Sequence, residues 1–261
     1  LWNGNELLIW GGYVTSGSLN YTGGRYNPIA DTWQVISDEN APSRRSNHTA
    51  VKMEDKMIIW GGRNSNGPIN NGGIYDPVSD SWTLIGDINS PPMSRHFSIW
   101  TGNELLLWGH ELIGSNLVTT KGYKFDPFSN LWTQMTETNE TSVRSNSSVR
   151  WTGINMIVCG GSSGGTTYNS GYSYHPSSDT WNEISTLGAP DPMYDHEAIW
   201  TGTNMIVWSN ENSGSYDPES NSWLNIKEHE AWGNIVWADS EMYVWGSANS
   251  EGHRLNIYIP H

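Results

Sequence analysis

A short apolar run closed by Trp-Gly-Gly recurs along the chain, and one copy of it is Met57-Ile58-Ile59-Trp60-Gly61-Gly62. The first five runs end about 50 residues apart, and a period of this length predicts a repeat architecture. The six runs end at Trp10, Trp60, Trp108, Cys159, Trp208 and Trp245.

Each repeat divides into four strand-like pieces. The apolar run is the second piece, and its continuous hydrophobicity predicts a strand covered on both faces. The third piece ends in an aromatic residue before an Asp-Pro-type turn, which predicts a turn closed by the Asp or Asn side chain. Fifteen of the sixteen tryptophans occupy three repeat positions, which favours a packing role between sheets. The fourth piece carries Trp33, Trp82, Trp132, Trp181 and Trp223.

Four strands in about 50 residues are typical of a β-propeller blade. The Gly-Gly pair after an apolar strand, the aromatic-Asp-Pro turn and the following Trp resemble the kelch family, and the Trp-Thr-Gly version resembles kelch-like propellers of exported bacterial proteins. The resemblance implies an all-β, six-bladed kelch-like β-propeller of four-stranded antiparallel blades, which we expect to form a single domain over residues 1–261. The blades are expected at about 1–36, 46–86, 94–136, 144–185, 194–227 and 231–261.

The two terminal blades are expected to be incomplete in this chain. The ring would then stay open, or be closed by a missing terminal segment or a partner chain, because a propeller closes by pairing strands from both ends. Seven blades, with one absent from the chain, is the alternative.

Composition excludes some partners. The net charge of −14 repels phosphate backbones and anionic lipid, so we expect no nucleic-acid partner and no membrane insertion. The single cysteine, Cys159, occupies a position otherwise held by Trp, which favours a buried apolar role. Few lysines and many Asn, Gly, Trp and Thr residues favour an exported protein, extracellular or periplasmic.

In kelch-like propellers, the loops between second and third strands and the connections between blades crowd one mouth of the channel. Here the loops are about 13–22, 63–71, 110–120, 162–170 and 209–213, and they differ in sequence where the strands do not, so specificity should lie there. Cationic and aromatic side chains at this mouth would suit an anionic or hydroxyl-bearing ligand. Alternatively, the arginines bond backbone carbonyls of neighbouring blades. The predicted binding residues are Arg45, Arg95, Arg144, Tyr194 and Trp232.

His48, His96 and His196 share one repeat position. Three histidines around a channel could ligate a metal. They recur because the repeat recurs, however, so we interpret them as structural and predict no metal or cofactor.

These features predict a non-catalytic binding module that holds a glycan or protein partner at the loop-lined mouth. One alternative is a carbohydrate-active enzyme similar to the sialic-acid mutarotases, whose substrate carboxylate an Arg-lined mouth would suit. Another is a structural subunit of a larger extracellular assembly. The position of Cys159 argues against a copper enzyme of the galactose-oxidase type, and no nucleophile elbow, phosphate loop or paired zinc ligands are present.

Overall fold

The computed structural model describes residues 1–13, 19, 22–113, 116–137, 144–209, 212–226, 233–238, 241–245 and 252–255. Within these ranges all regular secondary structure is β-strand. No helix long and apolar enough to cross a membrane occurs in this described part of the chain. The chain divides into two compact units, residues 1–137 and 138–261, which are described separately.

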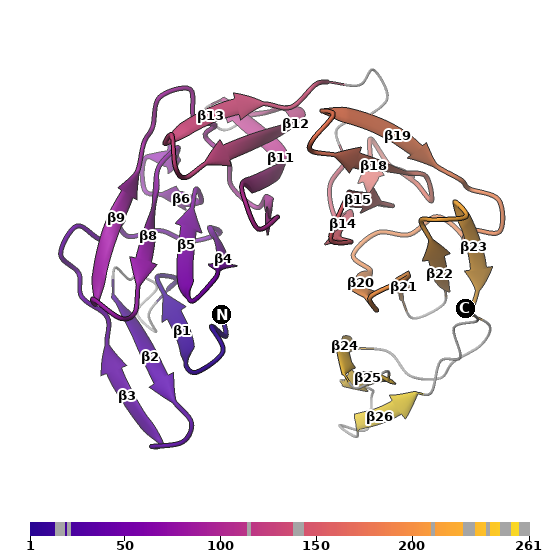
Figure 1. Ribbon diagram of the computed structural model, residues 1–261. Coiled ribbons are helices and arrows are strands. Elements are labelled where there is room, and N and C mark those ends of the chain that lie inside the picture. The colour runs from indigo at the N-terminus through magenta and orange to yellow at the C-terminus, as the bar shows by residue number, and fades with distance from the viewer. Residues whose placement is uncertain are drawn as a thin grey trace. The chain divides into compact units, whose positions relative to one another are not determined.

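The first unit contains three antiparallel sheets in which strands follow one another in sequence order (Figure 1). A two-stranded hairpin interrupts the second sheet between its second and third strands. The first sheet is β1 (Leu7–Trp10), β2 (Gly23–Asn27) and β3 (Thr32–Val35). The second is β4 (Thr49–Met53), β5 (Lys56–Trp60), β8 (Gly72–Asp76) and β9 (Ser81–Ile85), with the hairpin β6 (Arg63–Asn64) and β7 (Gly67–Pro68). The third is β10 (Phe97–Trp100), β11 (Leu105–Ile113), β12 (Asn116–Asp126) and β13 (Leu131–Gln134).

The second unit repeats this arrangement with three further sheets. The fourth sheet is β14 (Ser148–Trp151), β15 (Met156–Cys159), β18 (Gly171–His175) and β19 (Thr180–Ile184), with the hairpin β16 (Ser162–Ser163) and β17 (Thr166–Thr167). The fifth is β20 (Glu197–Trp200), β21 (Met205–Trp208), β22 (Ser213–Asp217) and β23 (Ser222–Asn225). The sixth is β24 (Asn234–Ala238), β25 (Glu241–Trp245) and β26 (Gly252–Leu255).

The all-β architecture of four-stranded antiparallel sheets is therefore confirmed, and each expected repeat forms one sheet. The number of blades in the ring, its closure and the single-domain assignment stay predictions.

The prediction of a second strand buried on both faces is confirmed. Met57, Ile58, Ile59 and Trp60 of β5 are each no more than 1% exposed. Alternate side chains of a strand point to opposite faces. Accordingly Met57 and Ile59 pack in a cluster with the first sheet, whereas Ile58 and Trp60 pack in a cluster with the third. This apolar run thus joins the second sheet to both the first and the third.

The turn between third and fourth strands also forms as predicted. The Asp76 carboxylate accepts the Val78 backbone N–H at 2.9 Å, and Asp126 accepts that of Phe128 at 2.8 Å. The Asp or Asn that follows the turn adopts a left-handed backbone, which these two residue types tolerate better than others. The values of φ are 53° at Asp31, 50° at Asp80, 57° at Asn130, 53° at Asp179 and 50° at Asn221.

The tryptophans of the fourth strands do more than pack. The Trp82 indole N–H donates to the Ser37 carbonyl at 2.8 Å, and Asp80 accepts the Ser37 backbone N–H at 3.1 Å. Both groups belong to the second repeat and Ser37 to the first, so two hydrogen bonds tie the second sheet to the first. The same pair of bonds joins Trp132 and Asn130 to Gly86, and Trp223 and Asn221 to Ser185.

One expected loop is instead part of a sheet. Residues 110–120 were expected to form a loop, but β11 and β12 continue as a paired hairpin from Leu105↔Phe125 to Ile113↔Asn116. In the first, second and fourth repeats a Gly pair in the left-handed region turns the chain out of the sheet, as at Gly61 (φ 62°) and Gly62 (φ 88°). In the third repeat His110 replaces the second glycine, so the strand continues.

Candidate functional site

The candidate site is the end of each sheet at which the second strand ends and the third begins, and to which the next repeat connects; we call it the loop end. Its framework is a hydrogen bond from the second glycine of a Gly pair to the connection that enters the following sheet. Gly62 N–H donates to the Met93 carbonyl at 2.8 Å, and Gly161 N–H donates to the Met193 carbonyl at 2.9 Å. The connection is therefore held against the loop of the preceding repeat.

Arg45 is fully buried at the loop end of the second sheet. Its guanidinium donates to the carbonyls of Ser43 (2.8 Å), Gly61 (2.9 Å) and Asn71 (2.7 Å), and to the Asn71 Oδ1 atom at 2.5 Å. Gly61 and Asn71 are the two ends of the loop, so Arg45 clamps that loop closed. These acceptors belong mainly to its own repeat rather than to neighbouring blades.

Arg144 makes the equivalent clamp in the fourth sheet. It donates to the Gly160 carbonyl at 3.4 Å and to the Ser170 carbonyl and Oγ atom, each at 2.9 Å. Its guanidinium lies 4.0 Å from the centre of the Tyr168 ring, a cation–π distance. Unlike Arg45, Arg144 is only half-buried.

At the same repeat position the third and fifth sheets carry Met93 and Met193, which are buried among apolar side chains. Their loops need no clamp, because one is the paired β11–β12 hairpin and the other is a tight turn in which Ser209 N–H donates to the Asn212 carbonyl at 3.0 Å. Arginine thus occupies this position in the repeats whose second and third strands are joined by a loop of about ten residues.

Two other predicted binding residues are exposed. Arg95 has a left-handed backbone (φ 56°), and its N–H donates to the Asn47 carbonyl at 3.2 Å, which turns its side chain toward solvent. Tyr194 is 55% exposed, directly after Met193. The structure therefore brings Arg45 and Arg95 to loop ends of the first unit, and Arg144 and Tyr194 to loop ends of the second. Trp232 lies outside the described residues.

The burial of Arg45 changes its role in any binding hypothesis. A guanidinium with no exposed surface, whose donors already bond main-chain carbonyls, has nothing left to offer a ligand in solvent. We therefore correct the expectation of a direct contact: Arg45 positions the loop. Arg95 and Tyr194 retain accessible side chains.

The histidines lie between neighbouring sheets. His96 Nε2 bonds the Thr49 hydroxyl at 3.0 Å, and His196 Nε2 bonds the Ser148 hydroxyl at 2.9 Å. Each bond joins a histidine to the first strand of the preceding sheet. No group of three or more His, Cys, Asp or Glu side chains able to hold a metal occurs in the described part of the chain.

Burial moves the titration of these groups away from neutral pH. It lowers the pKa of His48 to about 4, with Arg45 adding a repulsive contribution, and that of His96 to about 3. It also lowers the pKa of His196 to about 4 and raises that of the Cys159 thiol to about 12. A general acid or base works best with a pKa near the operating pH. These four groups are therefore neutral structural residues at pH 7.

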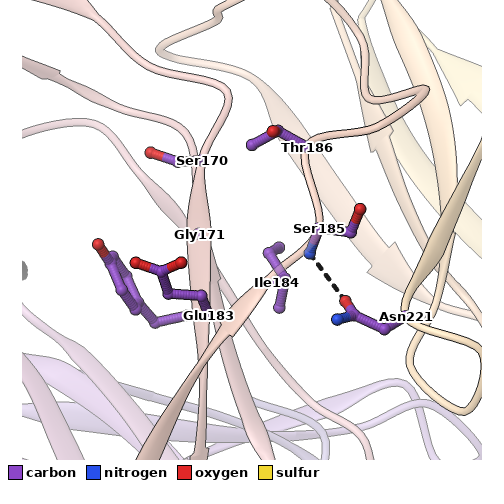
Figure 2. Close-up of a pocket in the computed structure, with 8 residues that line it drawn as sticks. Ser170, Gly171, Glu183, Ile184, Ser185, Thr186 and Asn221 are labelled. Carbon is purple, nitrogen blue, oxygen red and sulfur yellow. Dashed lines mark hydrogen bonds between the residues drawn. The ribbon is translucent and has the colours of Figure 1, made fainter.

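Sequence reasoning missed a cavity in the second unit. It has a volume of about 330 Å³ and lies where the fourth and fifth repeats meet (Figure 2). Its signal was present in the sequence: Tyr172 and Glu183 stand where the second repeat has Gly73 and Leu84. The lining residues are Ser170, Gly171, Tyr172, Glu183, Ile184, Ser185, Thr186 and Asn221.

Comparison with known proteins bears on the family. No curated protein matches the chain. The model of the Attractin/LZTR1 β-propeller family, however, matches residues 7–246. This match spans all six apolar runs, and the kelch-type repeats seen in the sequence appear as the antiparallel sheets of the structure. The chain therefore belongs to the Attractin/LZTR1 β-propeller family, a family of kelch-type propellers.

Proposed function

We propose that the chain is a non-catalytic binding module that holds a protein partner on the loop ends of its sheets. The β-propeller fold in general suggests a protein-interaction module. The observation that supports this location is the contrast between the two ends of the sheets: one end is nearly identical in every repeat, and the other differs from repeat to repeat.

The uniform end carries the turns between third and fourth strands, which the same Asp or Asn contact closes in the first, second, third and fifth repeats. In the fourth repeat His175 takes this place and bonds the Ser177 hydroxyl at 3.0 Å. The loop end carries short arms in the second and fourth repeats, β6–β7 and β16–β17, a long paired hairpin in the third, and a tight turn in the fifth. Variable loops on a rigid scaffold are where binding specificity usually resides.

The chemistry of the loop end favours a protein partner. Arginine and tyrosine are enriched among the residues that contribute most to protein–protein binding. Arg95 and Tyr194 expose these side chains, and Arg45 and Arg144 hold neighbouring loops in one conformation. A preordered surface loses less conformational entropy on binding. With a net charge of −14, the chain attracts a partner with a basic surface.

The test is quantitative capture of proteins from the exported fraction of the source. The native chain is compared with the double variant Arg95→Ala/Tyr194→Ala, which removes two exposed side chains and no described side-chain hydrogen bond. Arg45→Ala is unsuitable, because loss of its clamp would disturb the loop. We expect the partner to be retained by the native chain and reduced at least tenfold by the double variant, a change of about 1.4 kcal/mol.

A matched control removes exposed apolar side chains from the uniform end of the sheets. Val78 is 84% exposed and Phe128 is 91% exposed, so Val78→Ala/Phe128→Ala changes surface without changing packing. The control should capture the partner as the native chain does. Loss of capture in the control, with full capture by the Arg95/Tyr194 variant, would place the binding surface at the uniform end and overturn the proposal.

A further inference from the structure

The cavity between the fourth and fifth repeats has three walls. Ser170, Gly171 and Tyr172 at the start of β18 form the first, and Glu183 and Ile184 at the end of β19 form the second. The third consists of Ser185 and Thr186, which leave β19, together with Asn221 from the turn before β23. Figure 2 shows Ser170 and Glu183 on one side and Thr186 and Asn221 on the other, with Ile184 between Glu183 and Asn221. A volume of about 330 Å³ is at the small end of ligand sites and suits one ring-sized unit.

One lining residue, Glu183, is particular to this junction. Tyr172 and Glu183 lie opposite each other on β18 and β19. Opposed residues on antiparallel strands share a face and lie side by side. The corresponding pairs are Gly24 and Val35 in the first repeat, Gly73 and Leu84 in the second, Tyr123 and Gln134 in the third, and Gly214 and Asn225 in the fifth. The aromatic ring therefore recurs in the third repeat, whereas among these five repeats the carboxylate occurs in the fourth alone.

The hydrogen-bonding capacity of the cavity is mixed. The Asn221 Oδ1 atom already accepts the Ser185 backbone N–H and the Tyr216 hydroxyl, both at 2.8 Å. Because these bonds fix the carboxamide, its two Nδ2 donors stay available; no described residue accepts them. The Ser170 Oγ atom accepts from Arg144 at 2.9 Å, so its own O–H remains to donate. The Glu183 carboxylate can accept hydrogen bonds, and the Thr186 hydroxyl can both donate and accept them.

Charge argues against an ionic ligand. The lining contains one acidic side chain and no basic one, within a chain of net charge −14, which disfavours an anion. A cation is disfavoured by the Arg144 guanidinium, which lies against the wall at Ser170 and 5.9 Å from the centre of the Tyr172 ring. The ligand that suits such a site is neutral and carries groups that both donate and accept hydrogen bonds.

We propose that this cavity binds one neutral sugar unit, with Asn221 Nδ2 and the Ser170 hydroxyl donating to sugar oxygens and the Glu183 carboxylate accepting from sugar hydroxyls. Sugar hydroxyls both donate and accept, as this lining requires. The inference goes beyond the proposed function, since its residues and its ligand differ from those of the loop-end surface.

The test is saturation-transfer NMR on the full chain with four neutral probes: methyl α-glucoside, methyl β-galactoside, methyl α-mannoside and N-acetylglucosamine. Sialic acid and arginine serve as anionic and cationic probes. We expect transfer to at least one neutral sugar and to neither charged probe. Absence of transfer to all four neutral sugars, or transfer to a charged probe alone, overturns the proposal.

Two variants locate the binding. Asn221→Asp keeps the Oδ1 acceptor for Ser185 and Tyr216 but removes both Nδ2 donors, and the first, second and fourth repeats carry Asp at this position. Glu183→Leu installs the residue of the second repeat. Each should weaken sugar binding at least tenfold while the thermal midpoint stays near that of the native chain.

The matched control is Asn130→Asp, the same substitution at the same repeat position in the first unit. There Asn130 Oδ1 accepts the Gly86 backbone N–H at 2.9 Å, as Asn221 does for Ser185. Sugar binding should be unchanged in this variant. Binding that survives both cavity variants, or that falls equally in the control, overturns the proposal. Neither cavity variant alters Arg95 or Tyr194, so the test of sugar binding can fail or succeed independently of the test of the loop-end proposal.

Discussion

Replacing Arg45 by methionine should destabilise the first unit by about 3 kcal/mol. The substitution installs the residue that the third repeat carries at this position, Met93, and so conserves the apolar stem. It removes donors from three main-chain carbonyls, those of Ser43, Gly61 and Asn71. It also removes the bond to the Asn71 Oδ1 atom, and four bonds from a charged donor, at roughly 1.5 kcal/mol each, contribute about 6 kcal/mol.

Part of that loss is offset. Burial lowers the pKa of Arg45 from 12.5 to about 10, so holding the charged guanidinium in the fold costs about 3 kcal/mol at neutral pH. Methionine does not carry this cost. The balance leaves a net loss of about 3 kcal/mol, because the four lost hydrogen bonds outweigh the relief of desolvation.

Urea unfolding of the full chain, followed by tryptophan fluorescence, measures the overall change. Hydrogen–deuterium exchange assigns it, and peptides covering residues 61–71 should lose protection first, since Arg45 joins the two ends of that loop. Arg95→Met is the matched control: it makes the same chemical change on an exposed side chain and should alter stability by less than about 0.5 kcal/mol. A similarly small effect of Arg45→Met, or exchange that rises elsewhere but not in this loop, would refute the reasoning.

Three further changes test the sheet junctions. Trp82→Phe removes the indole donor to Ser37 and should lower the free energy of unfolding by about 1 kcal/mol in thermal or urea unfolding. The control Trp33→Phe changes an indole that is 57% exposed and should leave this free energy almost unchanged. Equal losses in the two variants would contradict the assigned bond. Burial lowers the pKa of His96 from 6.5 to about 3, so the unfolded chain takes up the proton first and stability falls as pH drops from 6.5 toward 3. At pH 5 the protonation of His96 lowers the free energy of unfolding by about 2 kcal/mol. His96→Gln should therefore flatten the pH dependence of stability in urea unfolding, and an unchanged slope would contradict the lowered pKa. Gly72→Ala would place a Cβ atom in steric overlap with the Ile59 carbonyl oxygen, so we expect a loss of about 3 kcal/mol in the same assay. A variant as stable as the native chain would exclude so close an approach.

Much of the fold was predictable because its determinants are local and periodic. An uninterrupted run such as Met57–Trp60 suits only a strand with both faces covered, and its recurrence about every 50 residues required similar sheets in series. The Asp-Pro turns were predictable for the same reason: a carboxylate bonds an N–H two residues ahead without any help from the rest of the chain.

The third-repeat loop shows where local reasoning failed. Residues 110–120 looked like their variable counterparts, but the absence of a second glycine allowed β11 and β12 to remain paired. The signal was a single residue, His110, in a position that the first, second and fourth repeats give to glycine.

The candidate site was less predictable than the fold. Arg45 and Arg95 appear alike in sequence, since both are arginines shortly before a histidine of the same repeat position: Arg45 stands three residues before His48, and Arg95 directly precedes His96. Yet Arg45 is fully buried and Arg95 is exposed, because they occupy different positions in the connection. The cavity at Tyr172 and Glu183 was missed because its walls come from two repeats, and no single repeat contains it.

The sequence by itself determined the β class, the repeat length, the strand order and the turns, since each depends on residues close together along the chain. The tertiary structure alone decided which arginines are exposed, which tryptophans bond the preceding sheet, and where two repeats leave a cavity. The physical reason is that hydrophobic periodicity specifies a strand and its faces, whereas the burial and hydrogen bonding of a polar side chain depend on atoms that the fold brings from about 10 to 50 residues away.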